Sequence, residues 1–115
     1  MKYALLVYES AHSSWQNLST EQQRAIHGEY RAVAASPGVT GLYRLRPPVM
    51  TTVRVEEDQI VQTEVRLTDT KEQLRAFYLL ESDDHGAVVE LAARIPAARM
   101  GGTVQIWPLT ELIAH

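Results

Sequence analysis

The stretch RAFYLLESDD, Arg75–Asp84, decides the fold more than any other part of this 115-residue chain. Its first seven residues alternate in a way that predicts a central β-strand, because apolar side chains fall on both faces of the extended backbone. One face would carry Ala76, Tyr78 and Leu80, and the other Phe77 and Leu79.

A helix is predicted to follow this strand directly. Asp83 and Asp84 place two carboxylates where they can accept hydrogen bonds from a helix N-terminus and complement its dipole. Apolar residues then recur at helical spacing up to Pro96, at Val88, Leu91, Ala92 and Ile95.

A second helix is predicted nearer the start of the chain. Ser19 and Gln22 form a capping box pattern, and the segment Ser36–Gly38, which reads Ser-Pro-Gly, supplies a stop. An apolar stripe between them includes Ile26, Tyr30, Val33 and Ala34.

The remaining segments complete an α+β pattern. Strands are predicted at Lys2–Tyr8, Val39–Leu45 and Thr103–Leu109, and a hairpin at Thr51–Val55 and Ile60–Val65. The order of the elements is that of a ferredoxin-like plan with a β-hairpin inserted after the second strand. Helices would cover one face of the sheet, so a second subunit is the expected cover for the other face.

Composition narrows the classes of protein to be considered. A chain of this length with 45% hydrophobic residues fits one domain, residues 1–115. The net charge of −3 and the lack of any basic run disfavour nucleic acid as a partner, and the absence of cysteine excludes disulfides and thiolate metal sites. The apolar run near Met1 is too short for a signal segment or membrane span, so we expect a cytoplasmic protein with no membrane partner.

Four segments together resemble the YCII-related proteins of the DGPF-domain type. They read MKYALLVY (1–8), TKEQLRAFYLLES (70–82), ELAARIPAAR (90–99) and TVQIWPL (103–109). The resemblance implies a dimeric α/β-barrel, a homodimer in which two ferredoxin-like units pack sheet against sheet and enclose a pocket. It also implies a link to extracytoplasmic-function sigma factors for many members, and cofactor-free dehydrochlorinase or lactone-processing chemistry for a few.

The chain departs from the family pattern at two places. The DGPF motif falls on Glu64–Leu67, which reads EVRL, so an acid is kept and the Gly-Pro turn is replaced by residues that favour a strand. The last strand of the family carries a Glu and an Arg before its proline, and here those places hold Gln105 and Trp107.

Three residues are candidates for proton transfer. Glu64 and Asp69 could act as a carboxylate base and its modulator, and His27 carries an imidazole, the side chain that proton chemistry at neutral pH favours. The alternatives are that Asp69 caps a turn at a strand edge and that His27 is an ordinary histidine of a helix surface.

Five further residues are candidates for substrate binding. Lys71 lies in the segment expected to form a pocket rim, Arg66 could hold a carboxylate, and Tyr3, Tyr78 and Trp107 could line an aromatic pocket. For the aromatic residues the alternative is packing in the core or the dimer interface, and for Arg66 it is simple exposure.

No motif for a cofactor is present. The sequence has no paired histidines beside an acid, no phosphate-binding loop and no nucleophile elbow, so we expect neither metal nor nucleotide. Two functions remain open: a cofactor-free lyase or isomerase acting on a small organic molecule, and a small-molecule-binding or regulatory dimer linked to a sigma factor.

Overall fold

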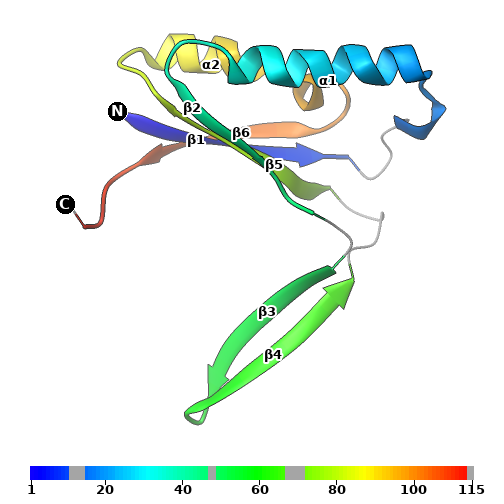
Figure 1. Ribbon diagram of the computed structural model, residues 1–115. Helices are drawn as coiled ribbons and strands as arrows, with labels where there is room; N and C mark the ends of the chain where they lie inside the picture. The colour runs from blue at the N-terminus through cyan, green and yellow to red at the C-terminus, as the bar shows by residue number, and fades with distance from the viewer. Residues whose placement is uncertain (11–14, 47–48, 67–71, 114–115) are drawn as a thin grey trace.

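The chain folds into a four-stranded antiparallel sheet with helices on one face (Figure 1). The computed structural model describes residues 1–10, 15–46, 49–66 and 72–113. The strand order is β2-β5-β1-β6, with β1 at Lys2–Glu9, β2 at Val39–Arg44, β5 at Gln73–Glu81 and β6 at Thr103–Leu109. This is the predicted α+β class, and it is compatible with a ferredoxin-like plan.

Strand β5 is an inner strand, as its composition predicted. It pairs with β1 on one side and with β2 on the other. Along its length, buried Ala76, Tyr78 and Leu80 alternate with half-buried Phe77 and Leu79. The first set faces the helices and the second faces away from them, because successive side chains of a strand point to opposite faces.

Helix α1 (Thr20–Ala34) begins at the predicted capping box. The Ser19 hydroxyl accepts a hydrogen bond from the Gln22 amide at 3.1 Å, and the Gln22 side chain accepts one from the Ser19 amide at 2.8 Å. These two bonds satisfy donors that the first turn of a helix leaves without partners.

Helix α2 (His85–Ala93) begins at Asp84, whose carboxylate accepts a hydrogen bond from the Ala87 amide at 3.2 Å. Two short 3₁₀ turns, η1 (Trp15–Asn17) and η2 (Pro96–Ala98), complete the helical layer. In the described residues, no helix has the length and apolar character needed to cross a membrane.

The hydrophobic core lies between the helices and one face of the sheet. Tyr78 and Leu5 are fully buried at its centre, and the Tyr78 hydroxyl donates a hydrogen bond of 2.9 Å to the main-chain oxygen of Tyr30 in α1. The other buried members are Tyr3, Val7, Val33, Ala76, Leu80, Val88, Leu91, Ala92, Ile95 and Ala97.

The inserted hairpin forms a separate two-stranded sheet, which we call the arm. It consists of β3 (Val49–Glu56) and β4 (Gln59–Arg66). Glu57 and Asp58 make the turn, and both have positive φ, 50° and 63°, which suits the tight turns that join antiparallel strands. The arm projects away from the sheet, on the side opposite the helices (Figure 1).

Candidate functional site

One face of the four-stranded sheet has no helix over it (Figure 1). Side chains along each strand alternate between this face and the core. The residues next to those that pack into the core therefore point to this face. We call this surface the open face, and its members are Ala4, Leu6, Tyr43, Phe77, Leu79, Gln105 and Trp107.

Strand register arranges these residues in two rows across the sheet. Tyr43 lies opposite Phe77, Phe77 opposite Leu6, and Leu6 opposite Gln105. The second row runs through Gly41, Leu79, Ala4 and Trp107. Directly opposed side chains on one face are close enough to interact, so each row is a continuous strip of side chains.

Aromatic rings form one end of the first row. The rings of Tyr43 and Phe77 stack with centroids 5.3 Å apart and planes 26° apart. Gly41 has no side chain, which leaves room for the Tyr43 ring beside it, because a Cβ there would lie 2.8 Å from that ring. Tyr43 is 54% exposed, so much of this aromatic surface faces outward.

Trp107 and Gln105 add a polar group at the other side of the open face. The Trp107 indole donates a hydrogen bond of 3.0 Å to the Gln105 carbonyl oxygen, and Trp107 is 52% exposed. The two N–H groups of the same amide remain able to donate to a ligand. Gln105 and Trp107 are therefore bonded to each other.

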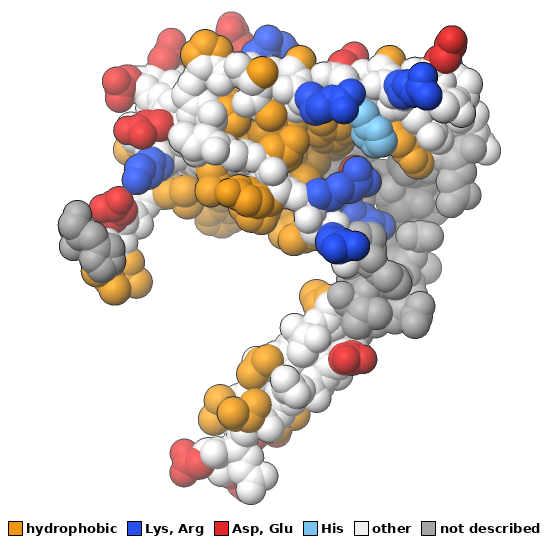
Figure 2. Space-filling model, in the orientation of Figure 1, with side chains coloured by type: hydrophobic (Ala, Val, Ile, Leu, Met, Phe, Trp, Pro, Cys, Tyr) orange, Lys and Arg blue, Asp and Glu red, His pale blue; other side chains and the backbone are white. Residues whose placement is uncertain are grey.

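Arginine side chains gather on the body of the molecule near the base of the arm (Figure 2). Arg44 and Arg46 are exposed at the end of β2, just before the arm begins. The Tyr30 phenol lies within electrostatic range of Arg44: burial raises the pKa of Tyr30 to about 12, with a contribution from the Glu9 carboxylate, and Arg44 and Arg99 oppose this rise. Arg99 also pairs with Glu29 of α1.

The structure separates the two described candidates for proton transfer. Glu64 is exposed on the arm, opposite Thr51. His27 is exposed on α1, where its ring lies 5.1 Å from that of Trp15 at 43°. Because α1 lies on the covered side of the sheet, His27 and the open face are on different sides of the molecule.

The aromatic candidates are also divided between the two sides of the sheet. Tyr3 and Tyr78 are in the core beneath the helices, 5% and 0% exposed, while Trp107 is on the open face. The three rings therefore do not line one pocket within a single chain. Arg66 ends β4 opposite Val49, and Asp69 and Lys71 lie outside the described residues.

Sequence reasoning did not single out Tyr43, Leu6 or Phe77 as members of a site. The signal for Phe77 was present in the alternation of β5, which put it opposite the core residues. Tyr43 could not be found in this way, because the pairing of β2 with β5 shifts between Val39 and Gly41. Such a shift changes which side chains reach each face.

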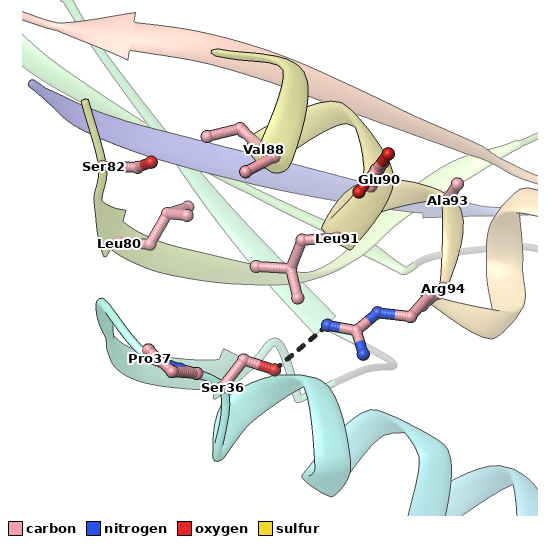
Figure 3. Close-up of a pocket in the computed structure, with 10 residues that line it drawn as sticks. Ser36, Pro37, Leu80, Ser82, Val88, Glu90, Leu91, Ala93 and Arg94 are labelled. Carbon is pink, nitrogen blue, oxygen red and sulfur yellow. Dashed lines mark hydrogen bonds between the residues drawn. The ribbon is translucent and has the colours of Figure 1, made fainter. Parts of the chain in front are cut away.

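A second concave surface lies in the helical layer (Figure 3). It is a groove of about 620 Å³ between the end of α1 and α2, with Leu80, Val88 and Leu91 among its apolar residues. The Arg94 guanidinium donates a hydrogen bond of 3.3 Å to the Ser36 hydroxyl across it. Two of its polar groups are thus bonded to each other.

The described residues include no group of three or more histidine, cysteine, aspartate or glutamate side chains placed to hold a metal ion. The open face itself offers aromatic stacking and hydrogen bonding through an amide, and the arm carries the Glu64 carboxylate.

The sequence matches one family model over nearly its whole length. That model, described as the YCII-related domain, matches residues 1–112, which include every strand and helix described above. No curated protein matches the chain.

Proposed function

The chain belongs to the YCII-related domain family, and from this premise we propose that it forms a homodimer that binds a small organic molecule on the open face. In this proposal the two open faces pack towards each other, as in a dimeric α/β-barrel, and the bound molecule is the substrate of a cofactor-free lyase or isomerase.

The stacked Tyr43–Phe77 pair carries the proposal. Ligand sites in proteins are mostly apolar and aromatic, with a few polar groups that orient the ligand. Here a flat ligand can stack on the exposed Tyr43 ring. The Gln105 amide, on the opposite edge strand, can donate to a group bound at that side of the open face. A surface of this kind, left uncovered by the helices, is typical of an interaction site.

Glu64 is the proposed base, because it is the described carboxylate among the family-aligned candidates. Its carboxylate would take a proton from a carbon of the substrate. In a lyase a leaving group then departs as an anion from the neighbouring carbon, and in an isomerase the proton returns to a different atom. Asp69 and Lys71 remain the proposed modulator and ligand-orienting cation.

A second function, binding without chemistry, is favoured by the separation of Glu64 from His27. Residues that shuttle a proton between donor and acceptor atoms must reach the same ligand, and these two lie on different parts of the molecule. In this alternative the open face only recognises the ligand, and the dimer is a regulatory partner of an extracytoplasmic-function sigma factor.

Two substitutions distinguish these functions once a ligand is found by a calorimetric screen of small aromatic acids and lactones. We expect Phe77→Ala to weaken binding at least tenfold, since it removes half of the stacked pair. We expect Glu64→Gln to leave Kd within threefold while lowering turnover by about 10²–10⁴-fold, the usual contribution of a positioned base.

The matched control is Glu21→Gln, which removes an exposed carboxylate from the first turn of α1 and should change neither quantity. Ligand binding with no turnover by the wild type would favour the regulatory dimer. Unchanged binding in Phe77→Ala would contradict both functions, because both place the ligand on the open face.

A further inference from the structure

The arm exposes an apolar surface near its tip. Val55 lies opposite Ile60 and Val53 lies two residues before Val55, so all three side chains share one face of the hairpin. They are 69%, 75% and 58% exposed in the order Val55, Ile60, Val53. An isolated two-stranded hairpin is at best marginally stable in water, so an arm of this kind needs a surface to pack against.

The surface area of the chain is larger than its mass requires. It is 8583 Å², whereas a compact chain of 12.9 kDa would expose about 6,300 Å². The radius of gyration, 16.5 Å, likewise exceeds the roughly 13 Å expected for this length. The difference of about 2,300 Å² in area is within the range that each partner of an obligate dimer buries, about 1,000–2,500 Å².

Charges at the two ends of the arm are complementary. Its turn carries the exposed acids Glu57 and Asp58, and its base adjoins the exposed Arg46. A two-fold axis brings one copy's surface against the same surface of the other copy in reverse order. Two arms related in this way can therefore set the acidic turn of each beside Arg46 of the other.

The arm is also long enough to reach a second copy. Its strands have eight residues each, which corresponds to about 26 Å at 3.3 Å per residue. A four-stranded sheet is about 19 Å wide at a strand spacing near 4.8 Å. One arm is thus longer than the sheet of its partner is wide.

From these observations we propose that the arm of each protomer packs against a second copy of this chain, held by Val53, Val55 and Ile60 along one edge of the open face, so that the rest of that face stays free for the contact between sheets and for the ligand. Its acidic turn would then meet Arg46 at the base of the other arm. Glu64 lies on the same face of the arm as these apolar residues, so this packing also turns Glu64 towards the second copy. The inference rests on the homodimer of the proposed function, and it adds the contact by which the arms hold the two protomers together.

The first experiment compares the two faces of the arm. Val55→Asp and Ile60→Asp should each raise the dissociation constant of the dimer at least 100-fold in sedimentation equilibrium. Thr52→Asp and Thr63→Asp form the matched control, because these two residues lie opposite each other on the other face of the arm. Each should change the dissociation constant of the dimer less than threefold. Far-ultraviolet circular dichroism checks that each variant keeps the fold of the body.

The second experiment reverses one charge at each end of the arm. Arg46→Glu and Glu57→Lys should each weaken self-association about three- to tenfold, because like charges then face each other across the two-fold axis. A mixture of the two variants should form mixed dimers with near wild-type affinity, since both contacts become complementary again. If each arm packed on its own chain instead, the mixture would show no preference for mixed dimers.

These experiments distinguish failure of the arm contact from failure of the homodimer itself. If the Val55 and Ile60 variants dimerise like the wild type and a substitution on the open face does not, the arm inference is overturned and the sheet-paired dimer stands. If the wild type is monomeric at micromolar concentration, both are overturned.

Discussion

The hydrogen bond from the Tyr78 hydroxyl to the main-chain oxygen of Tyr30 joins the centre of the sheet to α1. Both phenols have raised pKa values. Burial raises the pKa of Tyr78, with a smaller contribution from Tyr30. Burial also raises the pKa of Tyr30 to about 12, with a contribution from Glu9, while a backbone hydrogen bond from Ala97 and the charges of Arg44 and Arg99 oppose the rise.

These shifts predict that the protein loses stability in alkali. A tyrosine whose pKa is higher in the folded state than in the unfolded state contributes stability that is complete below pH 10. For Tyr30 that contribution is lost as the pH rises from 10 towards 12. Tyr30→Phe should therefore reduce the fall in unfolding free energy between pH 10 and 12, measured by urea denaturation at a series of pH values. Equal slopes for variant and wild type would contradict the assignment to Tyr30.

At the scale of elements, local sequence signals placed both helices and the strands. The capping box at Ser19 and the carboxylate of Asp84 begin α1 and α2 as predicted, because a cap acts on amides only two or three residues away. The hairpin was also predicted, and the structure extends its strands to Val49–Glu56 and Gln59–Arg66. Its direction away from the sheet was not predicted, since no local signal specifies it.

Two glycines offer a matched test of how the elements are joined. Gly38 has φ of +88° between α1 and β2, and its carbonyl accepts a hydrogen bond of 2.8 Å from the Glu81 amide. A Cβ at this position would collide with the Glu81 carbonyl, so Gly38→Ala should lower the unfolding free energy by more than about 2 kcal/mol, combining backbone strain with the clash.

Gly28, in the middle of α1, is the control. A Cβ there would meet nothing within 4 Å, so Gly28→Ala should raise the unfolding free energy by about 1 kcal/mol through helix propensity alone. Both values are measured by chemical denaturation. Comparable stability of the two variants would show that the turn at Gly38 can move without cost.

At the scale of the whole molecule, the open face and the arm both lack a cover within one chain. Light scattering at micromolar concentration should give about twice the chain mass of 12.9 kDa. Trp107→Glu should shift the population to monomer, because it places a charge within the proposed contact between sheets. Val89→Glu is the control: Val89 is 45% exposed on α2, in the helical layer, and its substitution should leave the mass unchanged.

The candidate site was predictable only in part. Trp107 was named from its predicted strand and Glu64 from the resemblance, and both are exposed, on the open face and the arm respectively. Their roles in a site stay predictions. Tyr43 and Leu6 were missed, because membership of the open face depends on which strands are neighbours and on a shift in their register. The roles of Asp69 and Lys71 remain predictions.

The sequence by itself determined the elements, their caps and the alternation of β5, because these depend on residues within a few positions of each other. Only the tertiary structure decided which apolar face of each strand the helices cover. A strand with apolar residues on both faces can be covered on either, so the sequence could not show that Tyr3 and Tyr78 would be buried beneath the helices while Trp107 faced outward. The separation of His27 from Glu64 was decided in the same way, by packing between segments distant along the chain.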